Sequence, residues 1–258
     1  MSLVDGSSPE AAIWQLVESC GYTADLPHWT GLTEGFDSVL DLGCGIGRVA
    51  RHLAGQGREV VGVELDARLA GDLNRLAAGE PVTAVTGDVT ELGDLELGRE
   101  RFGAVIAPQQ LLHILGGEVS RQKALEGARE RLEPGGLAAF AISEWVREAS
   151  REVDVLPDVR EVGDWVYASR PVAVEHDPDS LTVVRLRQKV APDGSLEESY
   201  DSITLDRIDR NDLADEMEEA GLVAVRSVEV PQTDRHIATV IVVARHDGER
   251  SLHSGITP

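Results

Sequence analysis

Apolar and polar positions follow two different patterns along the chain, and the change falls near residue 145. Before it, continuous apolar runs such as 39–42 and 102–107 are separated by stretches with apolar residues at helical spacing. Continuous apolar runs are typical of parallel strands that are buried on both faces. The first half of the chain therefore predicts an α/β domain, in which helices cover both faces of a parallel sheet.

The individual elements follow from this spacing together with glycine, proline and capping signals. Strands are predicted at 39–42, 59–63, 82–85, 102–107 and 137–142. Helices are predicted at about 9–20, over IGRVARHLA, at 66–78 and at 118–132, the last one stopping at Pro134-Gly135-Gly136. In the first helix Ile13, Leu16 and Val17 fall on one side, which indicates an amphipathic segment ahead of the sheet.

After residue 145 apolar residues recur at every second position. The runs WVYASRPVAVEH, LTVVRLRQKV and LEESYDSITL lie within 164–205 and are typical of antiparallel strands. The segment APDGS between two of them contains an Asp-Gly pair, which favours a hairpin. We predict an antiparallel sheet inserted after the fifth strand, then a helix over NDLADEMEEAGL and two final strands, LVAVRSVEV and HIATVIVVAR.

The strongest chemical signal is the run VLDLGCGIG at 39–47, a strand followed by a glycine turn and the start of a helix. Glycine lets the backbone approach a ligand closely, and open parallel sheets bind ligands at the carboxyl ends of their strands. The spacing here is G-x-G-x-G, whereas a dinucleotide fingerprint would have glycine or alanine in place of Arg48. Since no Gly-Lys-Ser/Thr follows, the loop is not a P-loop.

Two acids follow the next two strands. Glu64 ends VVGVE about 20 residues after the glycine turn, where a carboxylate can accept both ribose hydroxyls of a ligand. Asp88 lies in Gly87-Asp88-Val89, where it can accept from an adenine amine while the Val89 N–H reaches a ring nitrogen. Glu64 could instead be a solvated strand end, and Asp88 a turn or helix-cap acid. Asp66 is predicted to cap the following helix.

Together these motifs resemble the class I methyltransferase family over about residues 38–143. LDLGCGIG is similar to its cofactor loop, VVGVE to its ribose acid, TGDV to its adenine step, FGAVIAP to its fourth strand and LEPGG to the turn before its fifth. The resemblance implies S-adenosylmethionine as the cofactor. It also implies a doubly wound, mostly parallel seven-stranded sheet in the order 3-2-1-4-5-7-6, with the last-numbered strand antiparallel.

The same resemblance suggests the domain organisation. It implies an N-terminal helical cap at 1–37, a core at 38–145 and 206–246, a lid at 146–205 and a flexible tail at 247–258. The inserted sheet is similar to the antiparallel lid of small-molecule methyltransferases, including sugar N-methyltransferases. Such a lid implies an enclosed site for a small-molecule acceptor rather than a polymer.

The resemblance also implies which residues contact the cofactor. They are Tyr22, Asp41, Gly43, Cys44, Gly45, Gly47, Glu64, Leu65, Asp88, Val89, Ala107 and Gln109. Cys44 is expected to pack. Tyr22 would meet the methionine end of the cofactor or simply pack.

Acceptor-side candidates are sought at the carboxyl ends of strands. A base is needed only if the nucleophile holds a proton, so catalytic residues are hard to identify in this fold. The candidates for catalysis are His113, Glu144 and His236, with Trp145 and Asp234 as further acceptor contacts. His113 could otherwise be a helix-face histidine, and Trp165 and Tyr167 could wall the acceptor pocket or fill the lid core. Pro108-Gln109-Gln110 departs from the Asn/Asp-Pro-Pro-aromatic motif of enzymes that methylate nucleic-acid and glutamine amines.

Composition narrows the partners. The formal net charge of −22, from 24 basic and 46 acidic residues, disfavours nucleic acid. The acids form a solvated surface or attract a cationic amine; the sequence leaves both open. Cys20 and Cys44, the two cysteines, can build neither a disulfide framework nor a zinc cage, so we expect no metal site and a reducing, cytoplasmic location. No apolar run approaches the length of a membrane span.

The acceptor atom (N, O or C) and the choice between monomer and homodimer stay open. Two other functions also stay open: a nicotinamide-dependent oxidoreductase on a Rossmann sheet, and a non-catalytic protein that binds an adenosyl ligand.

Overall fold

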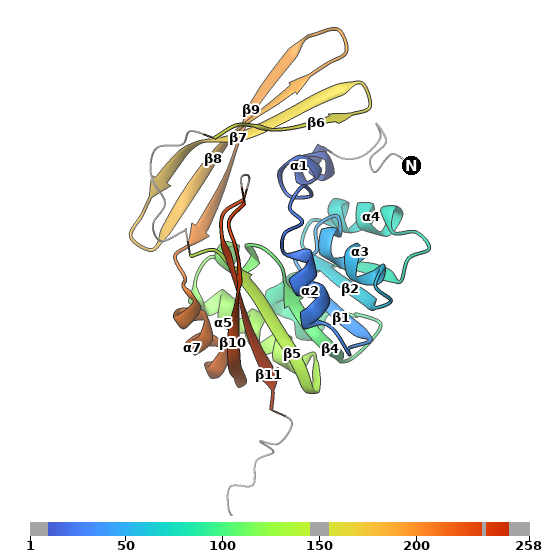
Figure 1. Cartoon of the computed structure of the whole chain (residues 1–258), viewed down its shortest axis with the longest axis vertical. Helices are drawn as coiled ribbons and strands as arrows, with labels where there is room; N and C mark the ends of the chain where they lie inside the picture. The colour runs from blue at the N-terminus through green and yellow to red at the C-terminus, as the bar shows by residue number, and fades with distance from the viewer. Residues whose placement is uncertain (1–9, 145–154, 234–235, 248–258) are drawn as a thin grey trace, which may run out of the picture.

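A seven-stranded sheet forms the centre of the computed structural model, which describes residues 10–144, 155–233 and 236–247 (Figure 1). Its strands are β1 (Ser38–Leu42), β2 (Glu59–Glu64), β3 (Val82–Thr86), β4 (Phe102–Ala107), β5 (Leu132–Ile142), β10 (Leu222–Val230) and β11 (Thr239–His246). The order is β10-β11-β5-β4-β1-β2-β3, and β11 runs antiparallel to both of its neighbours. The predicted sheet order and its antiparallel last strand are therefore confirmed.

Helices cover both faces of this sheet, as the continuous apolar runs predict. The helices are α1 (Glu10–Glu18), α2 (Leu26–Leu32), α3 (Arg48–Ala54), α4 (Ala67–Leu76), α5 (Glu118–Glu130) and α7 (Arg210–Glu219), with 3-10 turns η1 (Val89–Asp94) and η2 (Leu111–Ile114). Side chains of α2, α3 and α4 pack with Val39 on one face, and those of η1, α5 and α7 pack with Leu40 on the other. Neighbouring residues of β1 thus belong to different cores. None of the helices within the described ranges is long and apolar enough to cross a membrane.

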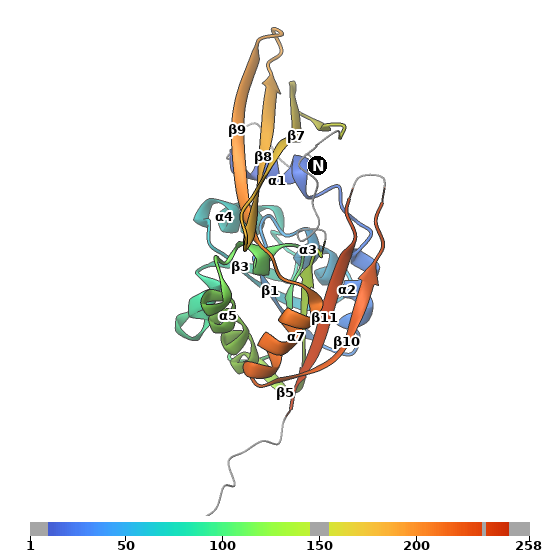
Figure 2. The ribbon, with the colours of Figure 1, turned by 90° about the vertical axis from the view of Figure 1, so that its left-hand side faces the viewer.

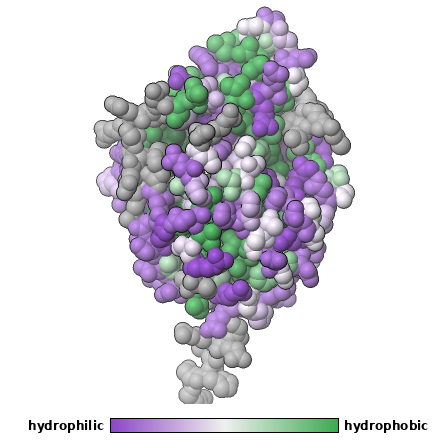
Figure 3. Space-filling model, in the orientation of Figure 1, coloured by the Kyte–Doolittle hydropathy of each residue, from purple (hydrophilic) through white to green (hydrophobic). Residues whose placement is uncertain are grey.

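The inserted lid is a separate antiparallel sheet that stands over the carboxyl edge of the core strands (Figure 2). It consists of β6 (Asp158–Val162), β7 (Trp165–His176), β8 (Ser180–Val190) and β9 (Leu196–Asp206) in sequential order. The predicted APDGS hairpin is confirmed, since the Ala191 N–H donates to the Ser195 carbonyl at 2.9 Å and joins β8 to β9. In Figure 3 apolar side chains gather over this lid, while hydrophilic residues dominate the lower part of the same face.

The helix before β5 ends earlier than predicted. It stops at Glu130, and β5 begins at Leu132, so Pro134-Gly135-Gly136 lies inside the strand rather than ending the helix. Leu132 pairs with Phe102 but Leu137 with Ala104, so the proline and glycines form an irregularity in the ladder. The Arg131 guanidinium donates to the carbonyls of Leu92 and Leu95, which fixes the chain as it enters the strand.

Four short elements were not predicted, namely α2, β6 and the 3-10 turns η1 and η2. Trp145, Asp234 and all but the first residue of the predicted tail lie outside the described residues.

The lid returns to the core at a buried ion cluster, which we call the Arg121 cluster (Arg121, Asp206 and Glu216). Arg121 on α5 donates to Asp206 at the end of β9 (2.8 Å) and to Glu216 on α7 (2.6 Å). Asp206 also accepts from the Gly117 N–H at 2.7 Å. The three side chains are only 9%, 18% and 10% exposed, so each charge depends on its partners rather than on water.

Helix α1 lies between the lid and the core. Its apolar side includes Ile13, Leu16 and Val17, as predicted, and it packs with Ile46 of the glycine loop and with Leu69 of α4. On its lid side the ring of Trp14 meets Tyr167 edge-on, with centroids 5.3 Å apart. Tyr167 thus packs against α1 rather than within the core of the lid, and its place in an acceptor wall stays a prediction.

Candidate cofactor and acceptor site

The glycine loop joins β1 to α3 at the carboxyl edge of the sheet. The Gly43 and Cys44 N–H groups both donate to the Val63 carbonyl, at 2.8 and 3.1 Å, so the loop is held against the end of β2. Gly43, Gly45 and Gly47 have φ values of 67°, 55° and 86°. Because this left-handed region strains residues that carry a Cβ, all three positions require glycine. The predicted loop is thus present, with its backbone able to approach a ligand.

Glu64 ends β2 beside this loop. One carboxylate oxygen accepts from the Gly45 N–H at 2.9 Å and the other from the Asp66 N–H at 3.0 Å. The carboxylate therefore already bridges two backbone donors at the strand end, rather than being a solvated strand end. Asp66 caps α4 by accepting from the Arg68 N–H at 2.8 Å, so its predicted role is confirmed.

Asp41 is a buried acid near the end of β1, two residues before Gly43. Its Oδ1 has no hydrogen-bond partner, although the residue is only 1% exposed. Burial raises the pKa of this carboxyl to about 7, against the attraction of Arg48, and Glu64 raises it further. A buried polar atom without a partner is costly, so the site favours a ligand that brings a donor. The ammonium group of S-adenosylmethionine is such a donor, and in this respect the residues fit the implied cofactor.

The remaining predicted cofactor residues lie at the ends of the neighbouring strands. Asp88 follows β3 and accepts from the Thr90 N–H and hydroxyl, each at 2.8 Å, so it caps η1. Val89 is buried, whereas Leu65 is 72% exposed directly after Glu64 and presents an apolar surface. The helix-cap alternative for Asp88 is thus observed, and its adenine contact stays a prediction.

At the end of β4, Ala107 is fully buried and Gln109 has a φ of 67°. That conformation is strained for a residue with a side chain, and such strain is concentrated at functional sites.

A small cavity of about 60 Å³ lies within this loop region. It is lined by Gln15, Ser19, Cys20, Gly43, Cys44, Gly45, Ile46, Arg48 and Gln109. Cys44 is buried and belongs to the core on the α3 side, in agreement with its expected packing role. The structure therefore brings Gln109 to the glycine loop, and it adds Gln15 from α1, which the sequence did not single out.

Arg48 explains why the glycine motif departs from the dinucleotide spacing. Its guanidinium forms a two-pronged ion pair with Asp25 at 2.6 and 2.7 Å and donates to the Tyr22 carbonyl at 2.8 Å. The same group lies 5.1 Å from the centre of the Tyr22 ring, and that ring contacts His236 with centroids 4.7 Å apart. Arg48 thus anchors the N-terminal cap to α3, and it brings Tyr22 to the hairpin between β10 and β11.

His113 and Glu144 are both engaged by the fold. The His113 Nε2 accepts from the Ser143 N–H at 3.0 Å, which leaves Nδ1 to donate to the Asp206 carbonyl at 2.8 Å. The Glu144 carboxylate accepts from the Arg210 guanidinium at 2.6 and 2.8 Å, and that bond lowers its pKa. In this arrangement both ring nitrogens of His113 are occupied, and the Glu144 carboxylate is paired with a cation. Their catalytic roles, like that of His236, stay predictions.

Acid is expected to destabilise the protein partly through His113. Burial lowers the pKa of His113, so the unfolded chain binds this proton first as the pH falls. This contribution is present above the usual histidine pKa of about 6.5 and is lost as the pH falls toward the folded value, at about 1.4 kcal/mol per unit of difference. Urea unfolding at pH 8 and at pH 5.5 should show a larger loss for the wild type than for His113→Gln. A His28→Gln control should keep the wild-type loss, and equal losses in wild type and His113→Gln would contradict the assignment.

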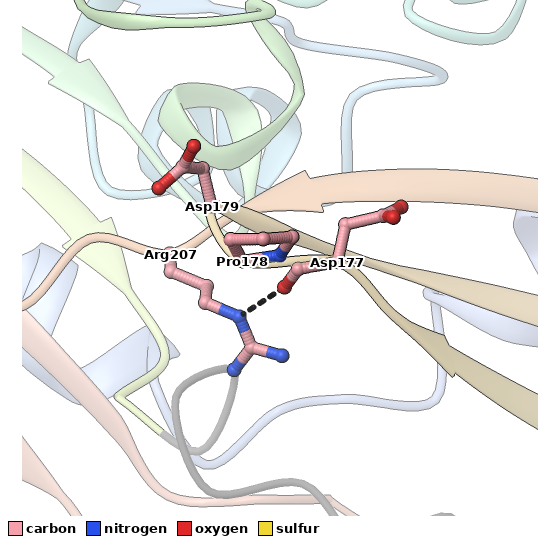
Figure 4. Close-up of a pocket in the computed structure, with 4 residues that line it drawn as sticks. All are labelled: Asp177, Pro178, Asp179 and Arg207. Carbon is pink, nitrogen blue, oxygen red and sulfur yellow. Dashed lines mark hydrogen bonds between the residues drawn. The ribbon is translucent and has the colours of Figure 1, made fainter.

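A separate hollow of about 520 Å³ lies at the junction of the lid with the core (Figure 4). It is lined by Asp177, Pro178, Asp179 and Arg207, and the Arg207 Nε donates to the Asp177 carbonyl at 3.2 Å. Its residues belong to the β7–β8 turn and to the end of the lid, and none of them comes from the carboxyl ends of the core strands. We therefore place the functional site at the glycine loop instead.

Comparison with known proteins agrees with this placement. Residues 39–136 match the model of a family described as a methyltransferase domain, and the match spans the glycine loop, Glu64 and Asp88. No curated protein matches the chain.

Solved structures share the fold over most of the chain. Streptomyces venezuelae DesVI has a TM-score of 0.70 at 20% identity, covering 89% of this chain and 94% of its own. CalS10, described as an amino pentose methyltransferase from Micromonospora echinaspora with SAM bound, has a TM-score of 0.67 at 20% identity, covering 89% and 91%. The sugar N-methyltransferase KedS8 from Streptoalloteichus sp ATCC 53650 has a TM-score of 0.69 at 19% identity, covering 94% and 95%.

At these identities the structural likeness establishes the fold alone. The resemblance inferred from the motifs is confirmed to this extent: the fold is that of class I methyltransferases, and residues 39–136 match the family model of a methyltransferase domain.

Proposed function

We propose that the chain transfers a methyl group from S-adenosylmethionine to an amine nitrogen of a small molecule. The observation that carries the cofactor assignment is Asp41, a buried carboxyl beside the glycine loop with one oxygen unpaired. It would accept from the ammonium group of the cofactor, and Glu64 would accept from the ribose hydroxyls. Asp88, Val89 and the exposed Leu65 would surround the adenine. When bound, the cofactor supplies a methyl group activated by a sulfonium, so the leaving group needs no acid.

The choice of an amine rests on what the chain offers around that methyl group. His113 and Glu144, two candidate bases, are held by the backbone and by Arg210. An amine that arrives with a free lone pair can attack without a protein base, which suits such a site. The net charge of −22 favours the approach of amines, which are largely cationic in water, over anionic molecules. Such an amine loses its proton to water before its lone pair attacks. The relatives described as a sugar N-methyltransferase and an amino pentose methyltransferase are consistent with this chemistry.

The main contribution of the protein would then be alignment and exclusion of water. The lid lies over the carboxyl edge of the sheet, where Tyr22 and His236 meet. We propose that these two side chains form part of the acceptor wall and orient the amine. The two free cysteines, of which Cys44 is buried, are consistent with action in the cytoplasm. Sedimentation would distinguish the monomer from the homodimer.

Calorimetric titration followed by a labelling screen tests this function. S-adenosylmethionine should give a saturable heat, whereas a nicotinamide dinucleotide should give none. Methyl-labelled cofactor should then transfer label to members of a panel of small amines, with S-adenosylhomocysteine released in equal amount. No heat at millimolar cofactor would refute the assignment. Label found only on hydroxyl or carbon acceptors would refute the choice of nitrogen, and binding without any transfer would indicate a non-catalytic protein.

A further inference from the structure

Helix α1 places the side chain of Gln15 inside the glycine loop. The Gln15 Oε1 accepts from the Ile46 N–H at 3.0 Å. The same oxygen lies against Gly45, where a Cβ on that glycine would stand. The Gly45 N–H is itself taken by Glu64 at 2.9 Å. Two backbone N–H groups of the loop are therefore satisfied by the protein's own side chains, and the open face of Gly45 is covered.

The space left beside Gln15 would hold only a small part of the ligand that we propose. The cavity in the loop measures about 60 Å³, whereas pockets for ligands of this class usually measure about 300–1,000 Å³. Gln15, Ser19 and Cys20 line the cavity from the α1 side, opposite Gly43 and Gly45. A ligand that enters this part of the loop therefore has to displace the Gln15 side chain, which α1 carries.

Helix α1 is fastened to the lid by charged as well as apolar contacts. Glu18 at its end accepts from the Arg187 guanidinium of β8 through two bonds of 2.8 Å, and from the Ser169 hydroxyl of β7 at 2.6 Å. The Arg187 guanidinium also lies 5.1 Å from the centre of the Trp14 ring, which itself meets Tyr167. The Glu18 and Arg187 side chains are 15% and 19% exposed, so the pair is largely shielded from water. A movement of α1 is therefore transmitted to β7 and β8.

We infer that α1 is a displaceable plug of the cofactor loop, with Gln15 occupying the loop and Glu18 coupling the helix to the lid. This inference rests on the proposed function. A ligand that replaces the Gln15 oxygen at the Ile46 N–H withdraws α1 from the loop, and the lid strands that Glu18 holds move with it. Displacing the plug costs part of the free energy of ligand binding. The apparent affinity of the protein for the ligand is therefore lower than that of a site without the plug.

Removing the plugging side chain should strengthen binding. Gln15→Ala is expected to lower the calorimetric Kd for S-adenosylhomocysteine by about two- to tenfold, since the variant no longer has to break the bond from Ile46. Gln56→Ala, an exposed glutamine after α3, is the matched control and should leave the Kd unchanged. A Kd for Gln15→Ala equal to or higher than that of the wild type would overturn the plug, because Gln15 would then be neutral or a ligand of the cofactor.

Hydrogen exchange tests the coupling to the lid. Saturating S-adenosylhomocysteine should increase amide exchange in Glu10–Glu18 of the wild type and should alter exchange in β7 and β8. In Glu18→Gln, which weakens the pair with Arg187, the change in α1 should remain and the change in the lid strands should shrink. Unchanged exchange in α1 on saturation would overturn the inference. No heat from either the wild type or Gln15→Ala at millimolar ligand would overturn the proposed function as well.

Discussion

Replacing Arg121 by methionine is expected to lower the free energy of unfolding by about 3–5 kcal/mol, the usual effect of removing one partner from a buried ion pair. Arg121 is the single cation of the Arg121 cluster, and its loss leaves the carboxylates of Asp206 and Glu216 largely shielded from water and without their cation. The methionine keeps most of the side-chain length, so the effect reports the uncompensated carboxylates rather than a cavity. Urea unfolding monitored by circular dichroism measures it.

Two further variants identify the cause. Lys123→Met removes an exposed cation from the same helix and should change stability by less than about 0.5 kcal/mol. Combining Arg121→Met with Glu216→Leu should recover part of the loss, because a buried charge disappears together with its partner. A single variant within 1 kcal/mol of the wild type would show that the cluster is solvated in solution.

Substituting Glu64 by glutamine is expected to weaken binding of S-adenosylmethionine by about 10- to 100-fold. Hydrogen bonds to a charged group contribute about 1.5–3 kcal/mol, and the amide keeps the shape of the side chain while losing its charge. Its NH2 group would also face the Gly45 or the Asp66 N–H, each of which now donates to the carboxylate. Calorimetry gives the affinity, and the melting temperature of the free protein shows whether the loop itself is disturbed.

Glu59→Gln provides the matched control, because Glu59 begins the same strand at the opposite edge of the sheet. It makes the same change in net charge, so it corrects for long-range attraction of the cationic ligand. Binding by Glu64→Gln within twofold of this control would remove Glu64 from the cofactor site.

The sheet was predictable because each core strand is a continuous apolar run that ends in a turn signal. Two other parts of the fold could not be predicted from such runs, namely α2 and the start of β5. The segment LPHWTGL forms α2 although it contains proline and glycine and is too short for a helical period. Its stability comes from contacts distant in sequence, since Trp29 is fully buried and donates to Asp25, which Arg48 also binds. The sequence predicts that the helix stops at Pro134-Gly135-Gly136, because it cannot show that α5 already ends at Glu130.

The glycine loop and the position of Glu64 beside it were predictable for a related reason. Gly43, Gly45 and Gly47 mark conformations that other residues rarely adopt, and Glu64 follows at a fixed distance. The acceptor side was not. His113 is indistinguishable from a base in sequence, and only the fold brings Ser143 and Asp206 to its two ring nitrogens. Gln15 gave no signal either, because a single polar residue in an amphipathic helix is ordinary until α1 is placed on the loop.

The lid is a single insertion in the chain, between the end of β5 and the start of α7. The strands that supply Asp41, Glu64 and Asp88 all precede that insertion point. Changing the length or sequence of the inserted hairpins therefore leaves the order of these strands in the sheet unchanged. In the proposed function, the lid would select the acceptor and the strands before it would hold the methyl donor, with Glu18 linking the two parts. Hairpins grafted in place of 158–205 would present a new wall to incoming molecules, provided that they keep a partner for Glu18 and an equivalent of Asp206. The core sheet would then be a scaffold for engineering transferases with altered acceptor selectivity.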